Sequence, residues 1–314
     1  MSIAFTFPGQ GSQAVGMGKA LADAFPQAAA VFAEVDEALS QKLSTLMFEG
    51  PEADLTLTAN AQPALMAVSL AVVRVLEAEA GLDLARDAQF VAGHSLVEYS
   101  ALAAAGSFSL ADTARLLRQR GEAMQKAVPV GQGAMAALLG LDYETGVAVA
   151  AEAAGPSDVC QIANDNGGGQ VVASGHKAAV ERAVEIAKAK GARRALMLPV
   201  SAPFHCALMQ PAADAMREAL ASVTIRAPKV PLVANVLAAP ISEPDEIRKR
   251  LVEQVTGTVR WRESVAYMAS EGVTTFYELG AGKVLSGLVK RIAEGASGIA
   301  IGQPVDIETF KSRP

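Results

Sequence analysis

One serine of this sequence stands where a nucleophile would be expected. Ser95 lies in the segment VAGHSLVEYS, after a short apolar run that predicts a strand, Phe90–Ala92, and before small residues that predict a helix. A serine on such a turn projects its hydroxyl above the sheet. The N-terminus of the following helix directs backbone N–H groups towards an oxyanion formed there. Gly-x-Ser alone is weak evidence, but this context predicts a nucleophilic serine.

A nucleophilic serine needs a general base, and the sequence holds three histidines. His94 adjoins Ser95, and because neighbours on a tight turn point apart, we expect it to be structural. His176 opens a predicted helix, where a solvated position is expected. His205 lies in SAPFHCALM, on a Pro-containing loop that could overhang a cleft, and it is the candidate base. No Asp or Glu is identifiable as a third member, so any acceptor, including a backbone carbonyl, could orient the imidazole.

An arginine falls on the apolar face of the predicted helix Ser109–Ala127. Apolar residues recur there at about 100° per residue and form one stripe, and Arg120 projects within it while the other charged residues lie opposite. The cost of desolvating a guanidinium is offset by snorkelling, by an unseen carboxylate, or by the carboxylate of a substrate in a bidentate pair. Both the structural and the ligand interpretation remain open at this point.

The order of predicted elements provides a scaffold for these residues. Apolar runs such as Ile3–Phe7, each followed by helical patterns, predict a parallel sheet with covering helices. Between residues 134 and 199 the order becomes β-α-β-β-α-β, the ferredoxin-like pattern. We therefore expect an α/β-hydrolase-like large domain of residues 1–130 and 200–314, with an inserted ferredoxin-like small domain of residues 131–199. After a strand at Val230–Asn235 we expect only helices, and a loose end after Pro304.

Composition narrows the classes of function. Of the 314 residues 51% are hydrophobic and 19% charged, and the net charge of −6 comes without a basic block, which argues against a nucleic-acid partner. Cys160 and Cys206 lack metal-ligand spacing and are expected to be plain buried thiols, so no metal is expected. MSIAFTFPGQG reads as a first strand and not as a signal peptide. No stretch nears the roughly 20 uninterrupted apolar residues of a membrane span, so we expect a cytoplasmic protein, monomeric by default, without a membrane partner.

Five ordered blocks carry a resemblance that covers nearly the whole chain. They are PGQGSQ at Pro8–Gln13, GHSLVEYSAL at Gly93–Leu102, RGEAMQ at Arg120–Gln125, PVSAPFHCALM at Pro199–Met209 and YELGAGKVLSGL at Tyr277–Leu288. Together they resemble the malonyl-CoA:acyl carrier protein transacylases of fatty-acid and polyketide synthesis. The resemblance implies the two-domain fold expected above and an enzyme that moves malonyl from malonyl-CoA to the phosphopantetheine thiol of acyl carrier protein. It implies no metal or redox cofactor.

The resemblance also implies roles for individual residues. It makes Ser95 the acyl-accepting nucleophile, His205 its base, and Arg120 the partner of the malonyl carboxylate. Gln254, in VEQVTGTVRW, matches the residue whose backbone carbonyl orients the histidine. That role would account for the missing acid.

A second group of roles concerns the walls of the acyl pocket. By resemblance, the backbone N–H groups of Gln10 and Leu96 would form the oxyanion hole. Asn164 and Asn166, in NDNGGGQ, match positions that face the cleft. Phe204, directly before the histidine, resembles the malonyl-selecting version of this loop, in which bulk excludes an α-methyl branch.

One position departs from the family pattern GHSLGE, because Val97 stands where that pattern has its second glycine. A valine there either crowds the elbow and slows the enzyme, or finds room beside small residues such as Ala101. Three other functions compete with acyl transfer. A serine hydrolase would use the same nucleophile, but it has no need of a buried arginine. A dinucleotide-binding loop at GQGSQAVG has the wrong glycine spacing, and a non-catalytic carrier-binding scaffold is suggested only by Val97.

Overall fold

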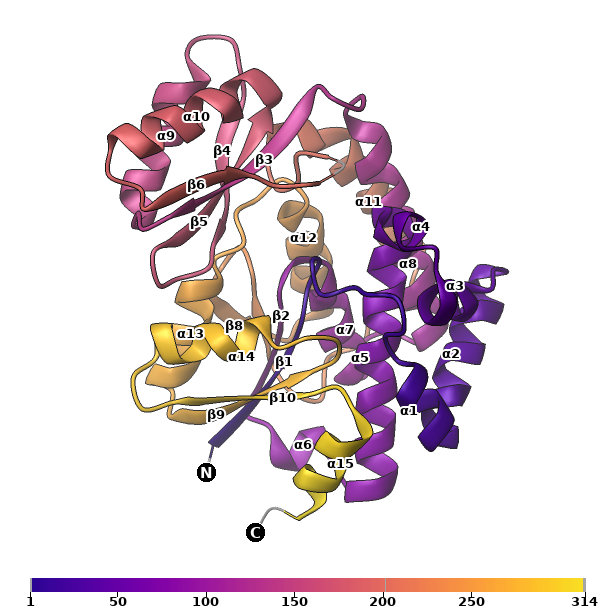
Figure 1. Cartoon of the computed structure of the whole chain (residues 1–314). Helices are drawn as coiled ribbons and strands as arrows, with labels where there is room; N and C mark the ends of the chain where they lie inside the picture. Colours follow the sequence, from indigo (N-terminus) through magenta and orange to yellow (C-terminus); the bar gives the residue numbers. More distant parts are fainter. Residues whose placement is uncertain (1, 201, 313–314) are drawn as a thin grey trace.

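Two β-sheets organise the chain in the computed structural model, which describes residues 2–200 and 202–312 (Figure 1). The large sheet has the strand order β10-β9-β1-β2-β7-β8 and the small sheet the order β4-β5-β3-β6. The strands are β1 (Ser2–Phe7), β2 (Phe90–Gly93), β3 (Gly133–Leu139), β4 (Cys160–Asp165), β5 (Gln170–His176), β6 (Arg194–Met197), β7 (Leu232–Ala234), β8 (Ala239–Ile241), β9 (Val273–Leu279) and β10 (Ser297–Ile301). The helices are α1 (Lys19–Ala24), α2 (Pro26–Leu39), α3 (Leu43–Glu49), α4 (Glu52–Thr56), α5 (Thr58–Ala80), α6 (Leu84–Asp87), α7 (Glu98–Ala104), α8 (Leu110–Ala127), α9 (Tyr143–Ala154), α10 (Lys177–Ala189), α11 (Gln210–Ala221), α12 (Pro244–Gln254), α13 (Trp261–Ser270), α14 (Val284–Ile292) and α15 (Pro304–Lys311), with short 3₁₀ turns at Ser95–Val97 and Ala207–Met209.

The large sheet separates two apolar layers. Its strands pair in parallel, except that β8 runs antiparallel to β7. Since successive side chains of a strand point to opposite faces, Phe5 and Phe7 enter the main core with α2, α5 and α8, while Ala4 joins α13 and α14 on the other side. The sequence-based prediction of a parallel, helix-covered large sheet is confirmed.

Helix α5 is the central helix of the main core. Among the described residues it alone is long and apolar enough to cross a membrane by length and composition, yet 89% of its most apolar 18-residue window is buried inside the protein. A helix that is apolar on all sides is expected in the core of a large domain.

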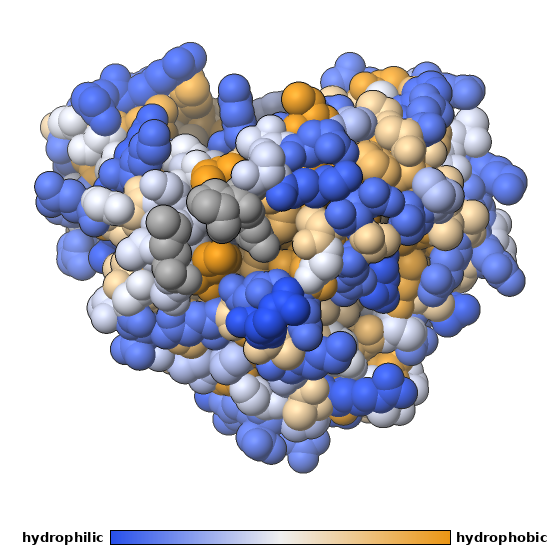
Figure 2. Space-filling model, turned by 90° about the horizontal axis from the view of Figure 1, so that it is seen from below, coloured by the Kyte–Doolittle hydropathy of each residue, from blue (hydrophilic) through white to orange (hydrophobic). Residues whose placement is uncertain are grey.

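The face of the molecule near the termini is a mosaic in which hydrophilic residues cover most of the outline (Figure 2).

The small sheet is antiparallel throughout, and its elements follow the order β3-α9-β4-β5-α10-β6. Helices α9 and α10 lie together over one face of it (Figure 1). Its core cluster contains only apolar residues and a cysteine, with many alanines and valines. The predicted βαββαβ order of an inserted unit is confirmed.

Hydrogen bonds tie the small sheet to the large-sheet part of the chain at the end of β4. The N–H of Asp165 donates to the carbonyl of Val259 (3.0 Å), and the N–H of Val259 donates to that of Ala163 (2.8 Å). The hydroxyl of Thr258 donates to the carbonyl of Ile162 (2.6 Å). This bridge lies far in sequence from the two chain crossings, so the small sheet is fixed at a third place.

The prediction for the end of the chain was wrong in two respects. The segment expected to hold only helices contains β8, β9 and β10, and β9 (VTTFYEL) has the β-branched and aromatic residues typical of a strand. The expected loose end after Pro304 is α15. It begins with a capping box between Gln303 and Asp306 and buries Ile307 and Phe310, so the end of the described chain is packed against the domain.

Candidate active site

Ser95 occupies a tight elbow between β2 and α7. Its φ of 60° is in the left-handed region, which non-glycine residues rarely adopt. Gly93 makes the elbow possible, because a Cβ at this position would lie 2.0 Å from the carbonyl oxygen of Val97. The strain presents the serine hydroxyl at the carboxyl edge of the large sheet, where the next strand, β7, also ends.

His205 faces the serine from the loop after β6. Its Nε2 lies 2.6 Å from Ser95 Oγ, and its Nδ1 lies 2.8 Å from the backbone carbonyl oxygen of Gln254. A carbonyl oxygen only accepts hydrogen bonds, so Nδ1 carries the proton and the neutral ring presents the Nε2 lone pair to the hydroxyl. His205 also has a positive φ of 57°, so both members of the pair, each on its own segment, have rarely populated backbone conformations.

The electrostatics of the site keep this imidazole neutral. Burial, with a smaller contribution from the positive charge of Arg120, lowers the pKa of His205 to about 3, while the hydrogen bond to Gln254 acts in the opposite direction. A neutral imidazole is the form that accepts a proton from serine. The residues therefore hold a nucleophile and its base ready for attack on a carbonyl carbon.

Arg120 is almost completely buried, with 1% of its surface exposed. Its guanidinium donates to Gln62 Oε1 and to Gln254 Oε1, both at 2.8 Å, and Nη2 lies 3.4 Å from Ser95 Oγ. It forms no salt bridge within the described ranges, and its Nε has no hydrogen-bond partner there. The burial expected from the helical stripe is confirmed, and a guanidinium without a carboxylate stands beside the nucleophile.

Gln10 and Leu96 lie at corresponding places on neighbouring strands. Parallel strands β1 and β2 pair Phe7 with Gly93, and each of the two residues lies three positions beyond that pair. The loop after β1 packs tightly on the elbow, because a Cβ on Gly9 would lie 2.8 Å from the carbonyl oxygen of His94. The two backbone segments thus meet beside the serine, as an oxyanion hole requires.

The asparagines come from the end of β4 in the small sheet. Asn166 Oδ1 lies 2.9 Å from Nε2 of His94, a half-buried residue whose ring packs against Trp261. Burial lowers the pKa of His94, so this histidine is neutral and structural, as its position beside the nucleophile suggested. Asn164 is buried at the bridge to Val259. Of the two asparagines, Asn166 is the one whose side chain contacts the elbow, through His94.

Two more predicted positions have clear surroundings. Phe204, directly before His205 in the sequence, is 6% exposed and belongs to the main apolar core. Val97 is fully buried in the same core, and its φ of −83° is an ordinary value for a residue with a side chain. The close approach at the elbow falls on Gly93 and not on Val97, which favours the alternative that small neighbours leave room for the valine.

Sequence reasoning missed three polar residues that complete the site. Asn235, just after β7, accepts from the N–H of Ser95 (2.7 Å) and donates to the carbonyl of Gly93 (2.8 Å). Glu98 and Gln62 are both about 1% exposed and connect to Asn235 and Arg120 respectively. A polar residue at the carboxyl end of a neighbouring parallel strand is a usable signal for Asn235. Glu98 is the last letter of the family pattern GHSLGE, but a glutamate in a first helical turn is common, so the pattern alone did not indicate that it is buried and paired.

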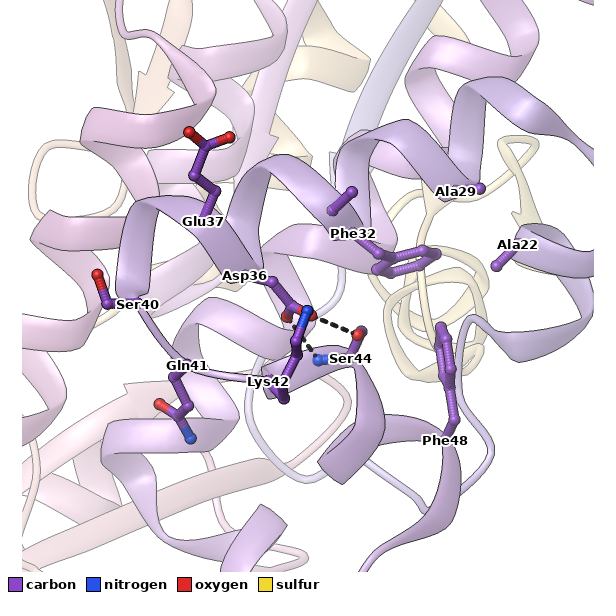
Figure 3. Close-up of a pocket in the computed structure, with 11 residues that line it drawn as sticks. Ala22, Ala29, Phe32, Asp36, Glu37, Ser40, Gln41, Lys42, Ser44 and Phe48 are labelled. Carbon is purple, nitrogen blue, oxygen red and sulfur yellow. Dashed lines mark hydrogen bonds between the residues drawn. The ribbon is translucent and has the colours of Figure 1, made fainter.

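A surface pocket of about 560 Å³ lies elsewhere, between α1, α2 and α3 (Figure 3). The carboxylate of Asp36 in its wall accepts from the N–H of Ser44 (2.8 Å) and from its hydroxyl (2.6 Å). That carboxylate therefore caps the start of α3. The residues that line the pocket include none of Ser95, His205 and Arg120, so this pocket is separate from the candidate site.

Comparison with known proteins agrees with this geometry. The acyl transferase domain family matches residues 4–301. A malonyl CoA-acyl carrier protein transacylase of Bacillus subtilis (strain 168) is 48% identical over 306 residues, which is 98% of this chain and 95% of the relative. The protein of that name from Escherichia coli (strain K12) is also 48% identical, over 96% of each chain.

Solved structures show the same relationship in three dimensions. An acyl-carrier-protein-S-malonyltransferase from Bartonella henselae superposes with a TM-score of 0.96 at 59% identity, over 98% of each chain. A malonyl-transacylase solved in complex with a type II PKS acyl carrier protein superposes with a TM-score of 0.95 at 42% identity, over 99% of each chain. Sequence, fold and the arrangement of Ser95 with His205 thus agree, and the chain belongs to the acyl transferase domain family.

Proposed function

We propose that this protein is a malonyl-CoA:acyl carrier protein S-malonyltransferase that works through a malonyl-Ser95 intermediate. One observation carries the choice of acyl group: the buried guanidinium of Arg120 lies 3.4 Å from the nucleophile without a carboxylate partner among the described residues. A malonyl group brings a carboxylate two bonds from the reacting carbonyl carbon. The names of the relatives from Bacillus subtilis and Escherichia coli support the same substrates.

In the first half-reaction, Ser95 Oγ attacks the thioester carbonyl of malonyl-CoA and its proton passes to Nε2 of His205. The backbone N–H groups of Gln10 and Leu96 stabilise the oxyanion of the tetrahedral intermediate. When the intermediate collapses, the C–S bond breaks and the protonated imidazole returns its proton to the CoA thiolate. The Gln254 carbonyl accepts from Nδ1–H throughout, so it holds the ring in one orientation and stabilises the imidazolium.

The second half-reaction repeats these steps in reverse. The phosphopantetheine thiol of acyl carrier protein loses its proton to His205 and attacks the malonyl ester, and Ser95 leaves with that proton. A thioester is already an activated acyl donor, so the proposed chemistry draws on no metal or redox cofactor. We further propose that the enzyme works as a cytoplasmic monomer.

The alternative functions fit the site less well. A general serine hydrolase would share the Ser95–His205 pair, but a buried arginine beside the nucleophile gives it no advantage. The glycine spacing after β1 does not suit a dinucleotide, and its loop packs on the elbow. A non-catalytic scaffold would have no need of the strained elbow.

The proposal is tested by mixing the enzyme with malonyl-CoA and following intact mass. We expect a malonyl adduct on Ser95 that disappears when acyl carrier protein bearing phosphopantetheine is added, with malonyl-carrier formed in equal amount. The Ser95→Ala variant is the control and should form no adduct. Release of the adduct mainly as free malonate, even with carrier protein present, would instead establish a hydrolase.

A further inference from the structure

Beneath the reacting pair lies a buried polar cluster, defined here as Glu98, Asn235, Gln254 and Arg120. All four side chains are at most 1% exposed. Glu98 comes from the first turn of α7, Asn235 follows β7, Gln254 ends α12, and Arg120 lies on α8. Four separate elements thus converge on one point behind the nucleophile.

Gln254 is the centre of this cluster. Its side-chain oxygen accepts from Arg120 at 2.8 Å, and its side-chain nitrogen donates to the carbonyl of Ser95 at 2.9 Å and to the carboxylate of Glu98. Its backbone carbonyl accepts from His205. Gln254 therefore contacts the backbone of the nucleophile, the base, and the arginine proposed to bind the substrate carboxylate.

The orientation of the Gln254 amide is fixed by its partners. Arg120 has only donors, so it requires the amide oxygen, and this leaves the amide nitrogen facing Glu98. The other oxygen of Glu98 accepts from the N–H of Asn235 at 2.8 Å. Both carboxylate oxygens are acceptors, which matches the ionised form. Burial outweighs the Asn235 and Gln254 donors and the charge of Arg120, which act in the opposite direction, and it raises the pKa of Glu98 to about 8. The assignment of the ionised form therefore rests on the two donors that face the carboxylate.

We propose that Glu98 is a positioning residue that sets the selectivity for malonyl: through the side-chain amide of Gln254 it holds the guanidinium of Arg120 in place for the substrate carboxylate. This inference rests on the proposed malonyltransferase function. Glu98 touches neither the nucleophile's hydroxyl nor the base. Its carboxylate contacts Asn235, which holds the backbone of the elbow, and Gln254, which leads to Arg120; the effect on the choice of acyl group belongs to the second route.

A single substitution converts this geometry into a test. In Glu98→Gln, the shape is kept, but the new amide places an NH₂ group against the NH₂ group of Gln254 whenever its oxygen still accepts from Asn235. Gln254 relieves the conflict by turning over its amide, and its NH₂ then faces the guanidinium of Arg120. Two donors oppose one another at that contact, so Arg120 loses its fixed position.

The measured quantity is the ratio of kcat/KM for malonyl-CoA to that for acetyl-CoA, because inactive or unfolded protein cancels from it. We expect Glu98→Gln to lower the ratio roughly tenfold, the effect of one charge-assisted hydrogen bond. Glu98→Asp keeps the charge but withdraws it by one methylene, and it should lower the ratio less. If Glu98→Gln is obtained only in small amounts, the ratio of the two kcat/KM values can still be measured on the folded fraction.

Glu278 provides a matched control. It is a second fully buried glutamate, and its carboxylate accepts from the N–H groups of Leu285 and Ser286 at the start of α14. Glu278→Gln should lower stability and leave the ratio unchanged. A fall in the ratio as large as that of Glu98→Gln would show that loss of any buried carboxylate has this effect and would overturn the proposal.

A double mutant examines the route of the effect. Because Glu98 acts through Arg120, Glu98→Gln should have no further effect on the ratio in the Arg120→Ala background. An unchanged ratio in Glu98→Gln alone, or an equal fall in both backgrounds, would refute the inference. A wild-type enzyme with no preference for malonyl-CoA would refute the proposed function itself, which keeps the two failures distinct.

Discussion

The carboxyl edge of the large sheet and the core of the small sheet bury very different side chains. At the edge, His205, Arg120 and Glu98 lie buried within one hydrogen-bonded cluster, and Ser95 and His205 have positive φ. The helix-covered face of the small sheet packs alanine, valine, leucine, isoleucine and one cysteine, although its strands also bury Asn164, Asp165 and Ser174. Buried polar groups are costly unless they are fully paired. The large domain accepts this cost where chemistry takes place, and the small domain is stabilised by apolar packing.

The largest expected effect tests the edge directly. His205→Ala removes the proton acceptor 2.6 Å from the nucleophile, so malonylation should slow by roughly 10³–10⁶-fold, since nucleophile and base act as a unit. Rapid mixing with malonyl-CoA and intact-mass detection gives the rate. A rate within tenfold of the wild type would remove His205 from the mechanism.

Arg120→Ala tests whether the buried cation of the edge serves the substrate or the fold. Removing a charge-assisted bidentate contact should lower kcat/KM for malonyl-CoA roughly a hundredfold. Acetyl-CoA has no carboxylate, so its kcat/KM should be unchanged or higher. Steady-state rates with both thioesters decide the matter, and an equal fall for both would make Arg120 a structural residue.

The pH profile sharpens the electrostatic part of the comparison. Since burial and Arg120 lower the pKa of His205 to about 3, kcat/KM for acetyl-CoA should stay level well below pH 6.5, the ordinary value for histidine. Arg120→Ala should move the acidic limb to higher pH. The same shift makes the free energy of unfolding fall as the pH drops below about 6.5, because the unfolded chain takes up a proton that the folded chain refuses. If kcat/KM of the wild-type enzyme for acetyl-CoA already fell by half at pH 6.5, the lowered pKa of His205 would be contradicted.

The smallest effects come from a matched pair of valines, one in each region. Val97 and Val180 are both fully buried. Val180→Ala, in helix α10 over the small sheet, should cost about 2 kcal/mol of unfolding free energy and leave the transfer rate unchanged. Val97→Gly should cost about 2–4 kcal/mol, from the lost packing and the conformational freedom of glycine. Urea unfolding and transfer rates measure both.

The rate of Val97→Gly also settles the earlier alternatives. The ordinary φ of Val97 and its place in the main core give no reason for a faster enzyme, so we expect a rate no higher than the wild type. A faster variant would show that the valine crowds the oxyanion hole after all.

The residues of the site that could be predicted from the sequence are those marked by a local pattern. Ser95, His205 and Arg120 could be found because each breaks a local pattern: a serine at the end of a strand, a histidine on a proline-rich loop, an arginine on an apolar stripe. Glu98 and Gln62 could not, because their partners lie on other elements and no local signal marks a residue as buried and paired. Strand β9 was missed although its residues favour a strand, since its pairing with β1 is a contact across more than 270 positions.

The bridge between β4 and Val259 bears on how the enzyme receives an acyl donor and then an acyl acceptor. With hydrogen bonds on both sides of Val259, we expect the inserted unit to move less than an insertion held at its two chain crossings alone. CoA and the carrier protein present the same pantetheine arm, so we expect one arrangement of the two sheets to serve both half-reactions. Slow amide hydrogen exchange at Val259 and Asp165, unaltered by malonyl-CoA, is the signature of this rigidity.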